Sequence, residues 1–137
     1  RQMCIRDRFE RRYVYDYTEP LDVNRMRKAA EYLCGTHDFK SFCGNKKMKK
    51  STVRTISRIQ IKELPGEIQI YYTGNGFLQN MVRILTGTLI EIGDGRRTPE
   101  DVSEILEAKN RERAGYTAPA CGLTLLEVIY GKMVCNK

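Results

Sequence analysis

Apolar residues between positions 73 and 95 recur at intervals of three and four, the spacing of a helix with one broad buried face. That face comprises Phe77, Leu78, Met81, Val82, Leu85, Leu89 and Ile92. Thr73 or Asn75 is expected to cap the first amides of the helix. Gly87 lowers helix stability by about 1 kcal/mol relative to alanine, so we expect a neighbouring backbone to approach it closely. The pattern therefore predicts a central helix that forms the core of the domain.

Two further helices are predicted from their start and stop signals. Asp22 is a suitable N-cap for apolar residues at helical spacing, and Gly35 ends that helix. Thr98 is the expected N-cap of the second helix, with Pro99 at its first position and acidic residues in its first turn. The buried face of this second helix is Val102, Ile105, Leu106 and Ala108. Both helices are amphipathic, so we expect them to cover a sheet.

Alternating apolar and polar positions predict the strands of that sheet. Residues 52–62 and 68–72 alternate around a Pro-Gly turn, which predicts an antiparallel hairpin. Residues 123–130 form an apolar closing strand, and residues 11–17 are expected as an edge strand or an extended lead-in. This order predicts an α+β fold with helices on one face of an antiparallel sheet, close to a ferredoxin-like arrangement with an extra helix.

The charge balance indicates the kind of partner. The 137 residues suit one domain or half of a two-domain enzyme, and 24 lysines and arginines against 17 acids give a net charge of +7. This excess favours a polyanionic partner, with nucleic acid the leading candidate. The five cysteines form no C-x-x-C pair, so neither a disulfide framework nor a zinc site is indicated, and a cytoplasmic location is the default. No apolar run approaches the length of a membrane span, and the first residues lack the apolar core of a signal peptide.

Basic residues are concentrated after position 45. Five of them lie in a run without apolar periodicity: Lys46, Lys47, Lys49, Lys50 and Arg54. Arg58 follows in the next predicted strand. Such a run is either a solvated loop or a set of phosphate contacts, and the sequence favours neither. All six residues are therefore candidate contacts to a nucleic acid.

Two local motifs have weak functional interpretations. His37 and Asp38 are adjacent in sequence, and adjacent side chains seldom converge on one atom, so we favour a structural loop over an acid/base pair. In the same loop, Phe39 and Phe42 are expected to enter the core. The string Gly-Asn-Gly at 74–76 lacks the third glycine and the lysine of a nucleotide-binding loop, and we reject that function.

A series of five strings carries a family resemblance. They are E-P-L-D at 19–22, H-D-F-x-S-F at 37–42, G-N-G-F-L-x-x-M-V-R at 74–83, T-G-T-L-x-E-I-G at 86–93 and A-G-Y-T-A-P-A-x-G-L-x-L at 114–125. Through them, from residue 9 to about residue 130, the chain resembles the C-terminal part of a tRNA pseudouridine synthase of the TruA family. Residues 1–8 do not match and are treated as an appendage, so residues 9–137 are expected to form the family's C-terminal domain.

The resemblance implies an isomerase that converts uridine to pseudouridine in the anticodon stem-loop of tRNA. Members of the family use an aspartate nucleophile and no metal or organic cofactor, and they usually act as homodimers with a tRNA cleft. The nucleophile lies in a G-R-T-D-x-G-V-H motif, and no such string occurs among the 137 residues. The isolated chain is therefore expected to be inactive. The alternatives are a non-catalytic basic RNA-binding module and an ordinary basic interaction domain.

Arg83 has the strongest site assignment. It is the one full charge between Thr73 and Ile90, so it needs a partner, and the resemblance implies an ion pair with the family's catalytic aspartate. Leu123 resembles the family's apolar pocket residue beside the base, and a simple core role is equally compatible with the sequence. Asp94 matches the family's glycine loop and not its nucleophile.

Tyr13 lies in a string that partly resembles the family's base-stacking tyrosine motif, with an ordinary packed aromatic as the alternative. The segment Thr117, Ala118 and Pro119 is expected to shape the rim of the pocket through its backbone geometry. The sequence leaves both expectations open to the tertiary structure.

Overall fold

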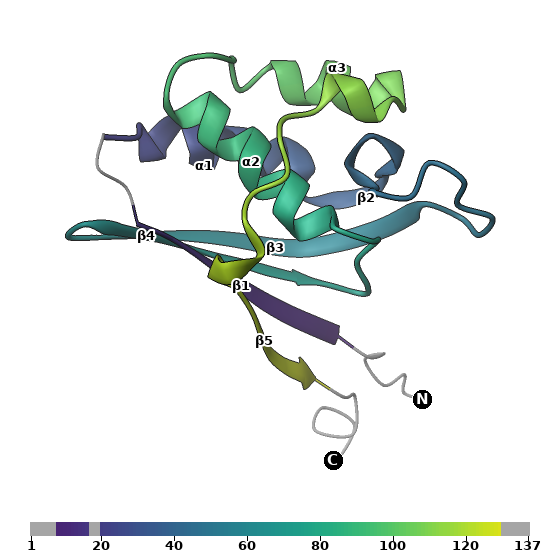
Figure 1. Ribbon diagram of the computed structural model, residues 1–137, viewed down its shortest axis with the longest axis horizontal. Helices are drawn as coiled ribbons and strands as arrows, with labels where there is room; N and C mark the ends of the chain where they lie inside the picture. The colour runs from purple at the N-terminus through teal and green to yellow at the C-terminus, as the bar shows by residue number, and fades with distance from the viewer. Residues whose placement is uncertain (1–7, 17–19, 130–137) are drawn as a thin grey trace.

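The computed structural model describes residues 8–16 and 20–129, which form a five-stranded antiparallel sheet with helices on one face (Figure 1). The strands are β1 (Arg8–Asp16), β2 (Gly35–Asp38), β3 (Val53–Leu64), β4 (Glu67–Gly74) and β5 (Leu123–Ile129). The helices are α1 (Val23–Leu33), α2 (Met81–Gly93) and α3 (Asp101–Ala108), with short 3-10 turns η1 (Lys40–Phe42), η2 (Arg111–Arg113) and η3 (Ala120–Gly122). The predicted α+β class is confirmed. Most of the expected appendage, residues 1–7, and the positions 17, 19 and 130 of the expected elements lie outside the described residues.

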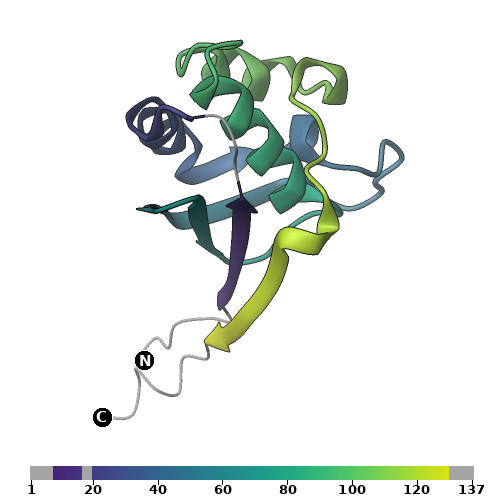
Figure 2. The ribbon, with the colours of Figure 1, turned by 60° about the vertical axis from the view of Figure 1, so that its left-hand side comes forward.

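The strand β1 is a central strand, so the expectation of an edge strand or a lead-in is wrong. The strand order is β2-β3-β4-β1-β5, and β1 pairs with β4 on one side and β5 on the other. Figure 2 shows β1 and β5 side by side at one end of the sheet. Tyr13 faces Ile70 on β4 and Leu123 on β5 in these two registers. An alternating pattern predicts a strand but not its neighbours, because those come from distant parts of the chain.

The hairpin of β3 and β4 is confirmed. The two strands pair antiparallel from Ile56 opposite Gly74 to Leu64 opposite Glu67. Gly66 has a φ of +78° in the turn, a conformation that glycine adopts without strain. The buried side of β4 carries Ile68, Ile70 and Tyr72, each with no exposed surface. This face of the hairpin therefore supplies the floor of the core.

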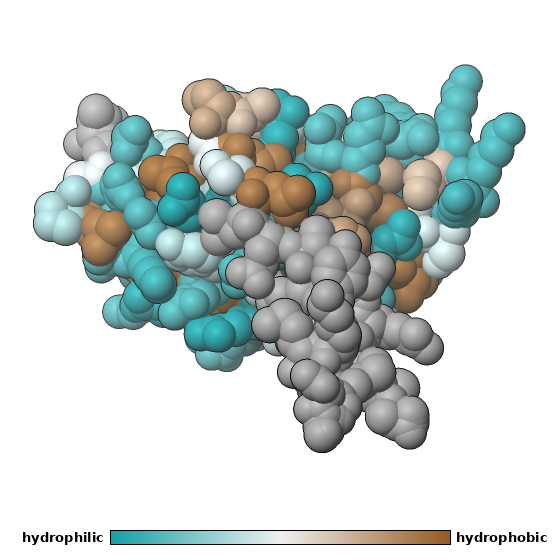
Figure 3. Space-filling model, turned by 90° about the horizontal axis from the view of Figure 1, so that it is seen from below, coloured by the Kyte–Doolittle hydropathy of each residue, from teal (hydrophilic) through white to brown (hydrophobic). Residues whose placement is uncertain are grey.

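The opposite face of the sheet carries polar side chains in the part of the chain that is described. The Tyr71 hydroxyl donates to Gln69 Oε1 at 2.9 Å, and Lys62 Nζ lies 4.8 Å from the centre of the Tyr71 ring. Figure 3 shows hydrophilic and hydrophobic residues interspersed on the surface seen from below. The hydrophobic core thus lies between the sheet and the helices.

Helix α1 begins as predicted. Asp22 is its N-cap, and the carboxylate accepts a hydrogen bond from the Arg25 amide at 3.2 Å. Its buried residues are Val23, Met26, Ala29, Ala30 and Leu33. Gly35 has a φ of +105° just beyond the helix, where it starts β2. Local signals were sufficient for this helix because cap, period and stop lie within one short stretch.

Helix α3 begins at Asp101, two residues after the expected start at Pro99. The Thr98 amide donates to the Asp101 carboxylate at 2.9 Å, while the Thr98 carbonyl accepts the Asp101 amide at 3.0 Å. These bonds span three residues, so the entry is a tight turn rather than α-helix. Val102 and Ile105 are buried as predicted, while Leu106 is partly buried against the core.

Helix α2 is the central helix, but it is shorter at its start than the apolar pattern predicts. Phe77 and Leu78 lie in the loop before it, and Asn80 is its N-cap in the left-handed conformation with a φ of 60°. The Asn75 side chain does not cap the helix, because its Oδ1 accepts the Thr55 amide at 3.0 Å. Every residue of α2 is buried except Arg83 and Glu91.

The expected close approach at Gly87 is confirmed. A Cβ atom at this position would lie 1.8 Å from the carbonyl oxygen of Tyr116. On the facing segment, a Cβ on Gly115 would lie 2.8 Å from Thr88 Cα. The two backbones are therefore in direct contact, which holds the segment that follows η2 across α2.

The segment at 37–42 is more ordered than the predicted polar loop. His37 and Asp38 belong to β2, which pairs with β3, and η1 follows. Phe39 and Phe42 are fully buried, as expected. His37 Nε2 lies 2.9 Å from the Cys34 carbonyl oxygen, while Asp38 Oδ1 accepts hydrogen bonds from the Lys40 amide and the Thr52 hydroxyl. These separate partners agree with a structural role for both side chains.

A candidate active-site pocket at the start of helix α2

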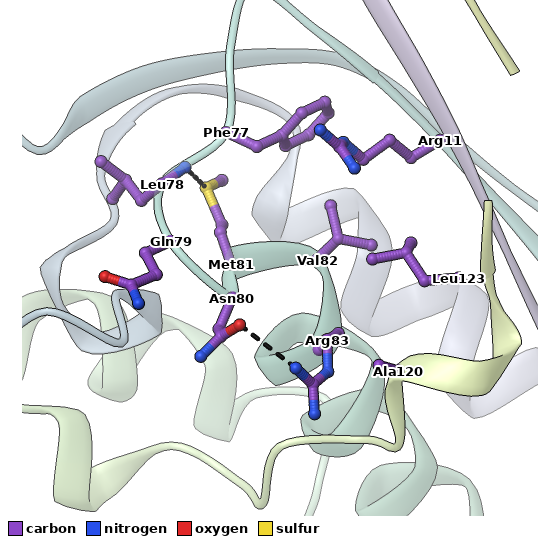
Figure 4. Close-up of a pocket in the computed structure, with 10 residues that line it drawn as sticks. All are labelled: Arg11, Phe77, Leu78, Gln79, Asn80, Met81, Val82, Arg83, Ala120 and Leu123. Atoms are coloured by element: carbon purple, nitrogen blue, oxygen red, sulfur yellow. Dashed lines mark hydrogen bonds between the residues drawn. The ribbon is translucent and has the colours of Figure 1, made fainter. Parts of the chain in front are cut away.

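A pocket of about 370 Å³ opens at the N-terminal end of α2 (Figure 4). Three segments line it: β1, the stretch from residue 77 to residue 83, and the start of β5 with the turn before it. Its lining residues are Arg11, Phe77, Leu78, Gln79, Asn80, Met81, Val82, Arg83, Ala120 and Leu123. The fold therefore brings Arg83 and Leu123, forty positions apart, to one cavity.

Arg83 is held in this pocket by neutral groups. Its Nε donates to the Ala118 carbonyl oxygen at 2.7 Å, and its Nη1 donates to Asn80 Oδ1 at 3.3 Å. The Arg83 carbonyl in turn accepts the Ala118 amide at 3.0 Å. Among the described residues, no carboxylate forms an ion pair with Arg83. A guanidinium has five N–H donors, so an oriented group with unused donors faces the cavity.

Arg11 contributes a second guanidinium that sequence reasoning missed. Its Cζ lies 5.9 Å from the centre of the Phe77 ring, a cation–π arrangement. Its Nε is buried and has no hydrogen-bond partner in the described part of the chain. A signal was present, because Arg11 shares the alternating face of Tyr13 and Tyr15. Its position beside Phe77 depends on the pairing of β1 with β4, which the pattern does not specify.

Leu123 and Val82 supply apolar walls to the pocket. Leu123 is partly buried and also packs against the core, so the pocket and core interpretations both apply to it. Such walls can exclude water from a flat ring, as ligand pockets with a few polar groups do.

Tyr13 does not line this pocket. Its side chain is only 2% exposed, and its hydroxyl donates to the Pro119 carbonyl oxygen at 2.7 Å. Burial raises the pKa of the Tyr13 phenol to about 12. The geometry agrees with the packed-aromatic alternative, in which Tyr13 holds the segment at 117–119 against the sheet.

The segment Thr117 to Pro119 is fixed at each residue. The Thr117 hydroxyl accepts a hydrogen bond from Arg111 Nη2 at 3.0 Å. The Ala118 carbonyl accepts from Arg83 Nε, and the Ala118 amide donates to the Arg83 carbonyl. Pro119 accepts the hydroxyl of Tyr13. These contacts fix the backbone beside Arg83, which is the kind of contribution expected from a pocket rim.

The six candidate basic residues do not form one cluster. The four lysines lie exposed in the loop between η1 and β3: Lys46, Lys47, Lys49 and Lys50. Arg54 is partly buried, and its Nη1 donates to the Ser51 and Val53 carbonyls, both at 2.8 Å. Arg58 is exposed beside a different cavity, between α1 and β3. The loop and Arg58 are therefore separate candidate surfaces.

Asp94 lies at the opposite end of α2 from the pocket. Burial by itself raises the pKa of this carboxyl, but hydrogen bonds and the charge of Arg96 outweigh that effect and lower the pKa. Arg96 Nη2 lies 2.7 Å from Asp94 Oδ2. This placement agrees with a role in the glycine loop.

Residues 29–131 match the sequence model of a protein family that is described as "tRNA pseudouridine synthase". The chain belongs to the tRNA pseudouridine synthase family. It is 52% identical over 124 residues to tRNA pseudouridine synthase A 1 of Bacillus cereus. The aligned region covers 90% of this chain and 50% of that protein. It is 48% identical over 126 residues to tRNA pseudouridine synthase A of Brevibacillus brevis, covering 92% of this chain and 52% of that protein. The chain thus spans about half the length of these curated relatives.

The described part of this tRNA pseudouridine synthase family member was also searched for metal-binding groups and membrane-spanning helices. Within residues 8–16 and 20–129, no three His, Cys, Asp or Glu side chains gather closely enough to hold a metal ion. None of the helices that the structure describes is both long and apolar enough to cross a membrane.

Proposed function

We propose that this chain is the C-terminal part of a tRNA pseudouridine synthase that isomerises uridine in the anticodon stem-loop of tRNA. The observation that carries the proposal is Arg83, which neutral partners orient into a pocket and which has no carboxylate partner in the described part of the chain. The names of the relatives support tRNA as the substrate class. The stem-loop position rests on the family resemblance.

The pocket suits the chemistry of this isomerisation. The bond between N1 of uracil and the sugar breaks, a bond from C5 to the same sugar carbon forms, and the hydrogen on C5 leaves as a proton while N1 gains one. Arg83 would hold a catalytic carboxylate in two-point geometry and keep it ionised. Leu123 and Val82 would exclude water around the base. Reaction at a base inside a stem also requires that the base leave the stack.

The catalytic carboxylate is proposed to come from residues outside this chain. No G-R-T-D string occurs among the 137 residues, and the chain spans half the length of its relatives. The isolated chain is then inactive, because a carboxylate is the group that reacts. A cytoplasmic location follows from the proposed substrate, and a homodimer of the complete protein is part of the same proposal, to be checked by light scattering.

The test is release of tritium from C5 of uridine in an unmodified tRNA transcript. The chain is assayed alone and then mixed with the half of the Bacillus cereus relative that this chain does not match. We expect no release from the chain alone and release from the mixture, which is abolished by Arg83→Met. Release by the chain alone would contradict the proposal, because it would require a nucleophile within these 137 residues.

The alternative is a non-catalytic basic RNA-binding module. The observation that favours it is the loop with four exposed lysines, Lys46, Lys47, Lys49 and Lys50. Replacing all four with glutamine is expected to lower the salt dependence of tRNA binding if they contact phosphates. Binding of tRNA without tritium release by any mixture would favour this alternative over the synthase.

A further inference from the structure

A second cavity, of about 180 Å³, lies beside η1 and carries only positive charges. The charged residues in its lining are Lys40, Lys46, Lys109 and Arg111. Its other lining residues, Cys43, Asn45 and Asn110, are neutral. Four cations around one small cavity attract an anion and oppose the approach of another cation.

Buried hydrogen bonds hold the two sides of this cavity together. Ser41 is fully buried, and its hydroxyl donates to the Ile105 carbonyl at 2.6 Å and accepts the Asn110 amide at 2.8 Å. These bonds join η1 to the end of α3. Lys109 ends α3 in the left-handed conformation, with a φ of 49°, so the chain reverses there and continues to Arg111. The cavity is therefore a built part of the fold and not a gap between mobile side chains.

Arg111 is the most constrained of the four cations. Its Nη1 donates to the Gly115 carbonyl at 2.8 Å, and its Nη2 donates to the Thr117 hydroxyl at 3.0 Å. The three lysines are exposed, so their ammonium groups can reach a ligand without loss of an internal hydrogen bond.

The described residues offer little negative charge to cancel these cations. Asp38 Oδ2 lies 3.9 Å from Lys109 Nζ, at the edge of ion-pair distance. The other oxygen of Asp38 accepts the Lys40 amide and the Thr52 hydroxyl. Glu91, whose charge acts on Arg111, is the second carboxylate near these cations. Two carboxylates therefore oppose four cations, and the cavity keeps a net positive charge.

Hydrogen bonds connect the segments that line this second cavity to those that line the candidate active-site pocket. The Gly44 amide donates to the Gln79 carbonyl at 2.8 Å, which joins the loop after η1 to the wall of the first pocket. A Cβ on Gly44 would lie 2.9 Å from Asn80 Nδ2. On the other side, Arg111 bonds Thr117, the neighbour of the Ala118 that holds Arg83. The segments that line the two cavities are therefore connected at two places, through Gly44 and through Thr117 with Ala118.

We propose that Lys40, Lys46, Lys109 and Arg111 bind a backbone phosphate of the RNA strand whose uridine enters the first pocket. The proposal rests on the proposed function, because it takes RNA as the ligand. A phosphodiester suits the site, since its oxygens accept hydrogen bonds from ammonium and guanidinium groups without any requirement for base sequence. The second cavity would thus fix the register of the strand while the first selects the base.

The test compares two variants that each remove two positive charges. One carries Lys40→Gln and Lys109→Gln in the second cavity. The control carries Lys28→Gln and Lys62→Gln, away from it. Each variant removes one lysine that lies near a carboxylate, so the two variants are matched in this respect. Lys109 lies near Asp38, and Lys28 lies 3.4 Å from Glu100. Binding of an unmodified tRNA transcript to the 137-residue chain is measured by filter binding over a range of salt concentrations, and circular dichroism verifies that each variant is folded.

We expect the cavity variant to bind tRNA about 10-fold more weakly and to lower the salt slope by about 1, the value for one phosphate contact. The control is expected to change affinity for tRNA by less than about 3-fold. Its two lysines contribute only to the general attraction between a basic protein and RNA, and salt screens that attraction. Equal losses in the two variants would overturn the proposal. Failure of the unaltered chain to bind tRNA at all would instead count against the proposed function.

Inorganic pyrophosphate separates an RNA phosphate from a free anion. We expect millimolar pyrophosphate to displace little tRNA, because one cavity supplies a small part of the total contact. Tight binding of pyrophosphate that the cavity variant loses, with tRNA affinity unchanged, would identify a site for a free phosphate compound and overturn the RNA assignment.

Discussion

The two ends of helix α2 differ in whether their polar groups have partners within the chain. At the C-terminal end, each of the last four carbonyls has a partner, as the ends of buried helices require. The donors are the Nε of Arg25 and the amides of Asp22, Asp94, Gly95, Arg96 and Arg97. Arg25 also donates through Nη2 to the Arg97 carbonyl at 2.6 Å, and Arg97 pairs with Glu91 at 2.6 Å. This end is closed by groups that the chain itself supplies.

The N-terminal end of the same helix is open. Its N-cap, Asn80, forms no capping hydrogen bond with the helix amides, and its side chain accepts from Arg83 instead. Arg83 has no carboxylate partner among the described residues, although Arg97 at the closed end has one. The contrast indicates which polar groups maintain the fold and which are available to a ligand or to another part of the protein.

The largest expected effect lies between the two ends, at Gly87. Gly87→Ala would bring Cβ to 1.8 Å from the Tyr116 carbonyl oxygen, so the backbone contact that holds both ends in register must break. We expect a loss of more than about 3 kcal/mol in the free energy of unfolding, measured by urea denaturation. Gly76→Ala is the control, because its nearest new contact would be an ordinary 3.6 Å to Arg54. A Gly87→Ala variant as stable as the control would contradict the packing.

Arg83→Met tests the open end directly. In the reassembled enzyme of the proposed function, it is expected to lower pseudouridine formation by about 100- to 1000-fold, because the carboxylate loses its charged partner. Arg83→Lys keeps the charge but not the two-point geometry, so it should retain part of the activity. Arg96→Met, at the closed end, is expected to leave the rate unchanged. Full activity of Arg83→Met in the tritium assay would exclude Arg83 from catalysis.

Arg25→Met tests the closed end. It removes a hydrogen bond to the Ile92 carbonyl at the end of α2 and another to the Arg97 carbonyl in the loop that follows, and we expect the free energy of unfolding to fall by about 1–3 kcal/mol. Lys28→Met removes an ion pair whose side chains are 60% and 55% exposed, and it should cost less than about 1 kcal/mol. The comparison of the two ends would be wrong if thermal unfolding gave the reverse order.

Asn80→Asp has the smallest expected effect and sharpens the comparison. The new carboxylate would pair with Arg83 inside the chain and so occupy the guanidinium that the open end leaves available. We expect about 10-fold slower pseudouridine formation with stability unchanged or slightly raised. Asn80→Gly keeps the left-handed backbone without the side chain and should reduce the rate less. Unchanged activity of Asn80→Asp would show that Arg83 is not needed as a free partner.

Much of the local structure was predictable from the residues. The cap at Asp22, the hairpin of β3 and β4 and the close approach at Gly87 all depend on neighbours in sequence or on the absence of a side chain. The start of α2 was not predictable, because Phe77 and Leu78 fit the helical period while packing from a loop. The apolar pattern reports burial, and a loop can bury the same residues as a helix.

The residues of the candidate site also differ in whether the sequence indicated them. An isolated charge in an apolar helix marked Arg83 in advance, since burying a guanidinium without partners is costly. The alternation of β1 placed Arg11 on the face of Tyr13 and Tyr15 but did not place it beside Phe77, and no pattern indicated that Lys40 and Lys109 line one cavity. Those positions meet only when β1 enters the sheet and Ser41 joins η1 to α3.

The sequence by itself determined the family and the α+β class, and it marked Arg83 as the candidate charge for the site. It did so because motifs and periods are properties of short stretches. The tertiary structure decided the central position of β1, the open N-terminal end of α2 and the two neighbouring cavities. Each of these depends on contacts between residues far apart in the chain, and the free energy of those contacts is not available to any segment alone.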